Sequence, residues 1–238
     1  MLALSILFLS VIALGIITSV IFLNMLRKST ARLPEGWRKS TASKNFNLSV
    51  FFLLIFLILA FFNELVTGYL ACNNIPNGYV FTIFFTTATL LLFCFLFIHT
   101  QTRWKRYSYL ILYSILIGFL INGGHYHPLS SLTTSSSLLL NSIFFLAALL
   151  HLTDLLIHPK TDHFKFKLKI NLIILIFALM ADILTSFHWS DKTSDNVIDF
   201  PFVFLIQIGN MLLFYSSFAC VFIFEIIKLY RADKTNLV

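Results

Sequence analysis

Long apolar runs, separated by short polar segments, fill the chain from end to end. Seven runs are predicted to be helices, at residues 2–26, 48–71, 79–98, 108–121, 137–157, 170–187 and 200–227. A helix needs about 20 mainly apolar residues to cross a bilayer, and only the run at 108–121 needs its flanking residues to do so. The runs lack the short apolar–polar alternation of a membrane β-barrel. We therefore expect an all-α fold, a seven-helix transmembrane bundle formed by one domain, residues 1–238.

The composition favours a membrane protein over a soluble one. Hydrophobic residues make up 58% of the chain and charged residues 11%, and 28 of the 238 residues are phenylalanine. A soluble domain is about half apolar and about a quarter charged. The same numbers exclude a disordered chain and a nucleic-acid-binding protein, although the net charge is +7. We expect the phenylalanines to face lipid.

The basic residues predict the orientation of the bundle. Sixteen of the 17 lysines and arginines lie in every second connection or after the last run, and the remaining one, Lys192, follows Asp191. Basic connections mark the cytoplasmic side of a membrane protein. The N-terminus is therefore expected on the outer side and the C-terminus in the cytoplasm.

The longest basic connection runs from Arg27 to Asn47 and is the predicted contact surface for a membrane or cytoplasmic protein partner. The lipid bilayer is the other expected partner, because each basic residue near anionic headgroups gains about 1 kcal/mol. A solvated loop without a partner is the alternative interpretation. Nucleic acid is not expected as a partner.

Polar side chains within the runs are candidates for a binding site, because ionisable groups in a bilayer usually face the bundle interior or a cavity. Six lie in or beside the outer halves of their runs: Asn63, Glu64, Asp182, His188, Gln207 and Asn210. Together they would bind a small polar or cationic ligand or an ion, or respond to protonation of the histidine. The alternative is that they form hydrogen bonds between helices. Glu225 is expected to pair with Lys228 instead.

The polar stretch HLTDLLIHPKTDH, at 151–163, ends the fifth run. His151, Asp154 and His158 are spaced by three and four residues, so they share one face of a helix. Histidine and carboxylate side chains are zinc ligands, so a metal site is one interpretation and a proton relay is another. The interpretation we favour is that all three reach the inner membrane interface, with Pro159 ending the helix. No catalytic residue and no cofactor is predicted.

The pattern FFNELVTGYL, at 61–70, followed by SLLLNSIFFLAALLHLTDLL, at 137–156, resembles small seven-helix membrane proteins of bacteria. Some members of that group are associated with sensor kinases. The resemblance covers most of the chain, contains no diagnostic motif and assigns no functional residue. It implies a multi-pass protein of the bacterial inner (plasma) membrane with a receptor-like or accessory role.

The leading functional hypothesis is a receptor-like or accessory protein that couples the outer polar cluster, or a membrane partner, to the cytoplasmic side. An enzyme is less favoured, because the sequence contains no catalytic constellation. Three alternatives stay open. They are a small-solute or ion transporter or channel, a metal-dependent membrane-embedded lipid enzyme using His151, Asp154 and His158, and a structural subunit of a larger membrane complex.

Overall fold

Each predicted apolar run lies within a helix of the computed structural model, which describes residues 2–31, 41–73, 78–126, 134–159, 163–193 and 200–235. The described residues form seven helices and no strand, which confirms the all-α prediction. The helices are α1 Leu2–Ala31, α3 Thr41–Cys72, α4 Gly78–His99, α5 Arg103–Tyr126, α6 Thr134–Ile157, α7 Phe164–Thr193 and α8 Phe200–Thr235.

The helices extend past the apolar runs, because hydrophobicity marks only the part suited to the bilayer core, whereas backbone pairing continues beyond it. α1 continues to Ala31 and α3 begins at Thr41. The predicted loop from Arg27 to Asn47 is therefore wrong at both ends, and its central part, 32–40, lies outside the described residues. α6 ends at Ile157, two residues before Pro159, as expected.

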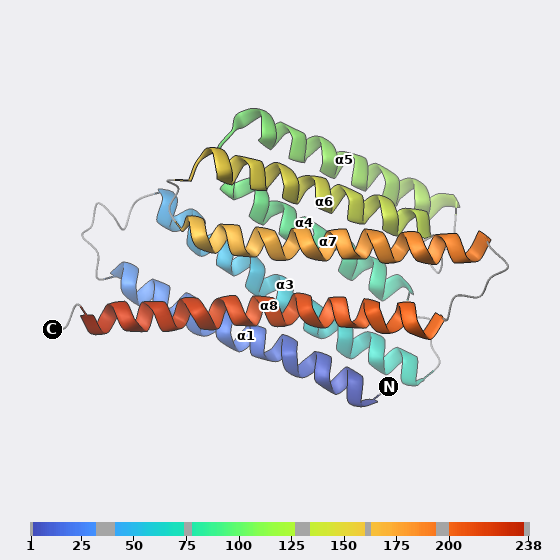
Figure 1. Cartoon of the computed structure of the whole chain (residues 1–238), viewed down its shortest axis with the longest axis horizontal. Coiled ribbons are helices and arrows are strands. Elements are labelled where there is room, and N and C mark those ends of the chain that lie inside the picture. The colour runs from blue at the N-terminus through green and yellow to red at the C-terminus, as the bar shows by residue number, and fades with distance from the viewer. Residues whose placement is uncertain are drawn as a thin grey trace.

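The helices run up and down, so the two chain termini lie at opposite ends of the bundle (Figure 1). Six helices form a closed ring of neighbours in the order α1, α3, α4, α6, α7, α8 and back to α1. α5 lies outside the ring and packs on α4 and α6 (Figure 1). This order brings the last turns of α4 and α6 to the same end as the first turns of α5 and α7.

We call this end the basic end, because the described basic residues other than Lys192 lie near it. They are Arg27, Lys28, Lys44, Arg103, Lys105, Arg106, Lys165, Lys167, Lys169, Lys228, Arg231 and Lys234. The opposite part of the bundle is called the far half below.

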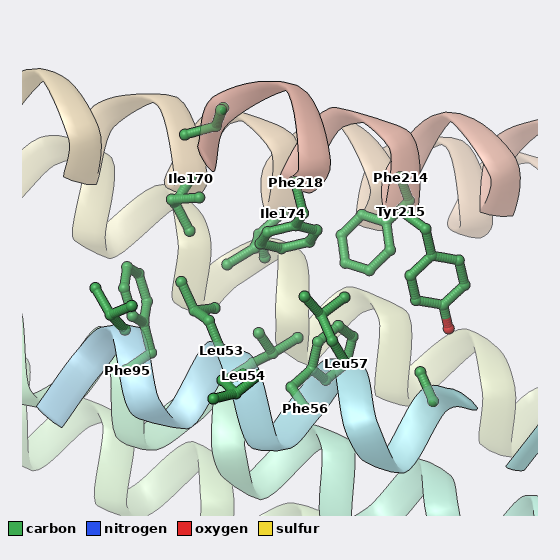
Figure 2. Packing of buried hydrophobic residues seen from close by; sticks show 14 of the residues in the cluster. Leu53, Leu54, Phe56, Leu57, Phe95, Ile170, Ile174, Phe214, Tyr215 and Phe218 are labelled. Atoms are coloured by element: carbon green, nitrogen blue, oxygen red, sulfur yellow. The ribbon is translucent and has the colours of Figure 1, made fainter. Parts of the chain in front are cut away.

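The interior of the ring is tightly packed with aliphatic and aromatic side chains (Figure 2). Leu53 and Leu57 of α3 lie against α7 and α8, where they meet Ile174 and Phe218 (Figure 2). Gly15 of α1 allows α1 to come close, since a Cβ atom there would lie 3.3 Å from Leu57 Cδ1. Small residues let membrane helices pack at such short distances.

Four phenylalanines from four helices meet in the interior near the basic end. Phe22 of α1 lies 6.3 Å from Phe46 of α3, 5.7 Å from Phe166 of α7 and 5.8 Å from Phe222 of α8, measured between ring centroids. The expectation that the phenylalanines face lipid is wrong for these four, which fill the junction of four helices, and for other buried phenylalanines such as Phe95 and Phe218.

Within the part of the chain that the structure describes, three helices are long and apolar enough to cross a membrane, in the segments Ile6–Lys28, Phe46–Leu70 and Ile208–Arg231. Shorter apolar segments are described at Leu90–His99 and Asn141–Ile157. Large apolar side chains such as Ile17, Ile176 and Leu213 point outward. These features are those of a multi-pass membrane protein, while the number of seven spans and their orientation stay predictions.

Candidate functional site at the basic end

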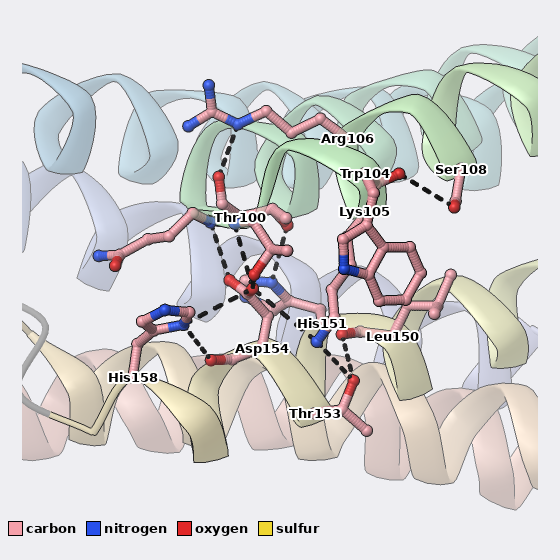
Figure 3. A network of polar contacts seen from close by, with 12 residues as sticks. Thr100, Trp104, Lys105, Arg106, Ser108, Leu150, His151, Thr153, Asp154 and His158 are labelled. Carbon is pink, nitrogen blue, oxygen red and sulfur yellow. Dashed lines mark hydrogen bonds and ion pairs between the residues drawn. The ribbon is translucent and has the colours of Figure 1, made fainter.

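The turn between α4 and α5 is held by a carboxylate that comes from α6 (Figure 3). Asp154, in the last turn of α6, accepts hydrogen bonds from the backbone N–H groups of Gln101 at 2.8 Å and Thr102 at 3.3 Å. It also accepts one from the Thr102 hydroxyl. Thr102 directly precedes α5, and its carbonyl accepts the first bond of that helix from the N–H of Arg106, at 3.2 Å. A side chain of one helix thus holds the residues that lead into another.

The charges at the start of α5 explain why a carboxylate belongs there. The first turn holds Arg103, Lys105 and Arg106 and no acidic residue, although the N-terminus of a helix favours negative charge. Asp154 supplies that charge, and Lys105 Nζ lies 3.8 Å from its Oδ1 atom. Lys105 Nζ also donates to the Thr153 hydroxyl at 2.9 Å. Both members of the Lys105–Asp154 pair are buried, so water screens their attraction little.

Arg106, in the first turn of α5, binds the end of α4 and so also holds the turn. Its Nε atom donates to the Thr100 carbonyl at 2.7 Å, and its guanidinium group lies 5.9 Å from the centroid of the Phe97 ring. A cation at the last carbonyls of a helix is favourable. The three-residue turn at 100–102 is therefore fixed by α5 on one side and by α6 on the other.

His151 lies one turn before Asp154 and points into the bundle, where it is 0% exposed. Its Nδ1 atom lies 3.3 Å from the hydroxyl oxygen of Thr100 (Figure 3). The Thr100 hydroxyl donates its own hydrogen to the Leu96 carbonyl at 2.8 Å, so it accepts the hydrogen of His151 Nδ1. The Nε2 atom of His151 is then left with a lone pair.

The expectation that His151, Asp154 and His158 all reach the membrane interface is wrong for the first two. Their polar atoms turn inward because the 100–102 turn offers them partners, and spacing along one helix cannot reveal a turn between two others. His158 does lie at the surface with its side chain 38% exposed, and its Nδ1 atom is 3.1 Å from the Asp154 carbonyl.

A metal site is not assembled in the part of the chain that the structure describes. No group of three His, Cys, Asp or Glu side chains there is arranged to hold a metal ion. The Asp154 oxygens are already used by the turn at 100–102, and the Nδ1 atom of His151 is used by Thr100.

In the far half, two members of the predicted outer cluster contact adjacent helices. Asp182 of α7 accepts from the Ser142 hydroxyl of α6 at 3.3 Å. Asn210 of α8 donates from Nδ2 to the Phe177 carbonyl of α7 at 3.5 Å. These contacts agree with the alternative that the polar residues form hydrogen bonds between helices.

No contact is described that joins the other four residues of the predicted outer cluster to one another. Asn63 of α3 is buried and Glu64 beside it is half-buried. The side chains of His188 and Gln207 lie outside the described part of the chain. That all six residues form one ligand or ion site stays a prediction.

Glu225 pairs with Lys228, as expected, at 3.7 Å. It also binds Lys169 of α7 at 3.0 Å, and Lys169 Nζ lies 4.0 Å from the centroid of the Phe224 ring. The acidic residue therefore joins α8 to α7 at the basic end, a contact that spacing within α8 cannot predict.

Several residues of the site were not predicted from the sequence, namely Thr100, Gln101, Thr102 and Lys105. A signal was present in the short polar segment HTQTRWKR, at 99–106, which follows an apolar run without any glycine or proline. A tight turn without these residues needs side chains to satisfy its backbone groups. The location of the partner in α6 becomes visible only when the helices are packed.

The fold and the site define an all-helical bundle with membrane-spanning character and a buried polar network at one end. The chain matches no protein-family model, no curated protein and no solved structure.

Proposed function

We propose that the chain is a multi-pass membrane protein with a receptor-like or accessory role, which acts through a protein partner bound at its basic end. In this proposal all seven helices span the bacterial inner (plasma) membrane, the N-terminus is outside and the basic end faces the cytoplasm. Partner binding couples the cytoplasmic side to the outer polar cluster or to another membrane protein.

The observation that carries the proposal is the use of the polar side chains at the basic end. Asp154, Lys105 and Glu225 all bind other helices of the same bundle, so they hold the end in shape. Exposed basic side chains surround this network, among them Arg103 and Lys165. A rigid end with an exposed basic rim suits docking of an acidic protein surface better than it suits catalysis.

The orientation is tested with thiol chemistry on intact cells. Cys72 is exposed at the end of α3, away from the basic end. A membrane-impermeant maleimide is expected to label Cys72 in intact cells, and Cys72→Ser is expected to abolish the labelling. A cysteine introduced as Lys228→Cys in a Cys72→Ser background is expected to react only after the membrane is opened. The reverse pattern would overturn the proposed orientation.

The partner is tested by photo-crosslinking from two matched tyrosines. Tyr107, in the second turn of α5, is 65% exposed, and Tyr69, near the end of α3, is 67% exposed. We expect benzoylphenylalanine at position 107, but not at position 69, to give one discrete protein adduct in the native membrane. Replacing Arg103 and Lys165 by glutamine is expected to reduce that adduct severalfold.

Three outcomes would contradict the proposed function. Adducts of equal yield from both positions, or an adduct unaffected by loss of the two charges, would contradict docking at the basic end. Solute flux through proteoliposomes of the purified protein would replace the receptor-like role with transport.

A further inference from the structure

Three buried polar atoms near the basic end have no hydrogen-bond partner among the described residues. They are His99 Nε2 on α4, His151 Nε2 on α6 and Asn171 Oδ1 on α7. His151 and Asn171 are fully buried and His99 is 6% exposed. Buried polar atoms in native proteins nearly always have a hydrogen-bond partner. We therefore ask which single partner could bind all three atoms.

The three residues lie around one junction of helices. The ring centroids of His99 and His151 are 6.4 Å apart, with the ring planes tilted by 36°. They therefore do not stack face to face as Phe46 and His163 do, with ring centroids 3.6 Å apart. Asn171 reaches the same region from α7, because its Nδ2 atom donates to the Ala148 carbonyl at 3.1 Å, one turn before His151.

The chemistry of these atoms limits what can bind them. His151 Nε2 carries a lone pair, because its Nδ1 hydrogen is directed to Thr100. Asn171 Oδ1 is an acceptor by nature, and its amide nitrogen is already engaged. At least two of the three atoms therefore accept hydrogen bonds, and a partner must donate to both.

The local charge argues against a cation as that partner. Lys105 and Lys167 are both buried, and the charge of Lys167 acts on both histidine rings, whereas the charge of Asp154 acts on His151 in the opposite sense. The nearby carboxylate, Asp154, is occupied by Lys105 and by the turn at 100–102. A metal ion or an ammonium group would be repelled, whereas a neutral donor would not.

We propose that the junction of α4, α6 and α7 is an internal water-binding site, in which an ordered water molecule donates to His151 Nε2 and Asn171 Oδ1 and also contacts His99 Nε2. Buried waters typically make about three hydrogen bonds to otherwise unsatisfied polar groups, which matches the three atoms present. The junction adjoins the turn that Asp154 holds, because the Thr100 hydroxyl of that turn contacts His151 Nδ1.

The test uses the full chain in lipid nanodiscs with isotope-labelled histidine and water-edited solid-state NMR. His99→Phe and His151→Phe each remove one histidine signal and so assign it, and glutamine at either position serves if phenylalanine prevents folding. We expect magnetisation from water to reach His151 and His99 about as efficiently as it reaches the exposed His158. Labelled Phe218 and Ile12, which are fully buried, must receive no magnetisation from water in the same experiment.

A second variant distinguishes bound water from general leakage into the bundle. Asn171→Leu removes one acceptor and fills the space with carbon, so water transfer to His151 is expected to fall severalfold while transfer to His158 is unchanged. If no magnetisation from water reaches His99 or His151 in the parent chain, the proposal is wrong. So would a stoichiometric transition metal in the purified protein that is lost in both histidine variants, because a metal would use the same lone pairs.

Discussion

The two ends of this bundle hold their polar groups in different ways. At the basic end, Asp154 has several partners at once, including two backbone N–H groups and the Lys105 ammonium group. In the far half, Asp182 and Asn210 contact neighbouring helices at 3.3 Å and 3.5 Å. At the basic end a buried carboxylate is therefore held by the fixed backbone donors of a turn, whereas the contacts described for Asp182 and Asn210 join one helix directly to the next.

The largest expected effect comes from removing the carboxylate of the basic end. Asp154→Ala leaves Lys105 buried without its counter-ion and two backbone N–H groups unpaired. Loss of one partner of a buried pair costs about 3–5 kcal/mol. We expect the free energy of unfolding, measured by titration with SDS in mixed micelles, to fall by about that much. His158→Ala is the control, and an equal loss in both variants would remove the proposed role of Asp154.

The aromatic junction at the same end ranks next. Phe22→Ala is expected to lower the free energy of unfolding by about 3 kcal/mol, because Phe-to-Ala changes in a packed interior leave a cavity. Phe62→Ala, at an outward-facing position, is expected to change it little. If the two variants lose stability equally in the same SDS titration, the four-ring junction does not hold the basic end together.

The Glu225 pair is expected to contribute less, because Lys169 and Lys228 are partly exposed to solvent. Glu225→Gln should lower the free energy of unfolding by about 0.5–1 kcal/mol, as exposed ion pairs do. The difference between parent and variant should shrink at high salt, because ions screen exposed charges. A difference that is independent of salt would indicate that Glu225 acts by packing.

The smallest effect is expected in the far half. Asn210→Ala removes a hydrogen bond between α8 and α7, and such bonds between membrane helices average about 0.6 kcal/mol. Ser142→Ala should lower the free energy of unfolding by a similar amount. In the double variant the two losses should add, because Ser142 and Asn210 share no partner among the contacts described. A loss from Asn210→Ala as large as that from Asp154→Ala would reverse the comparison and point to a polar network in the far half.

The sequence was sufficient to predict helices and insufficient to predict their polar contacts. Apolar runs predict membrane helices well, because only helices satisfy every backbone group within one segment, and each run lies in a helix. The spacing of Glu225 and Lys228 also predicted a contact correctly, because both residues lie on one helix. The partners of Asp154 in the turn at 100–102 could not be predicted, since Gln101 and Thr102 lie more than fifty residues away along the chain, on the other side of α5. In a chain that is apolar on every face, the sequence does not indicate which face turns inward.

The contact between Asp154 of α6 and the turn before α5 has a consequence for the order in which the chain can fold. The residues of the turn at 100–102 are synthesised before residue 154, so α4 and α5 exist for a time without the carboxylate that their connecting amides bind. Until α6 has been made and packs beside them, those two amides must bind water or another acceptor. The turn at 100–102 therefore acquires its carboxylate only after α6 has been made, while the contacts between α7 and α8 at the same end form later still.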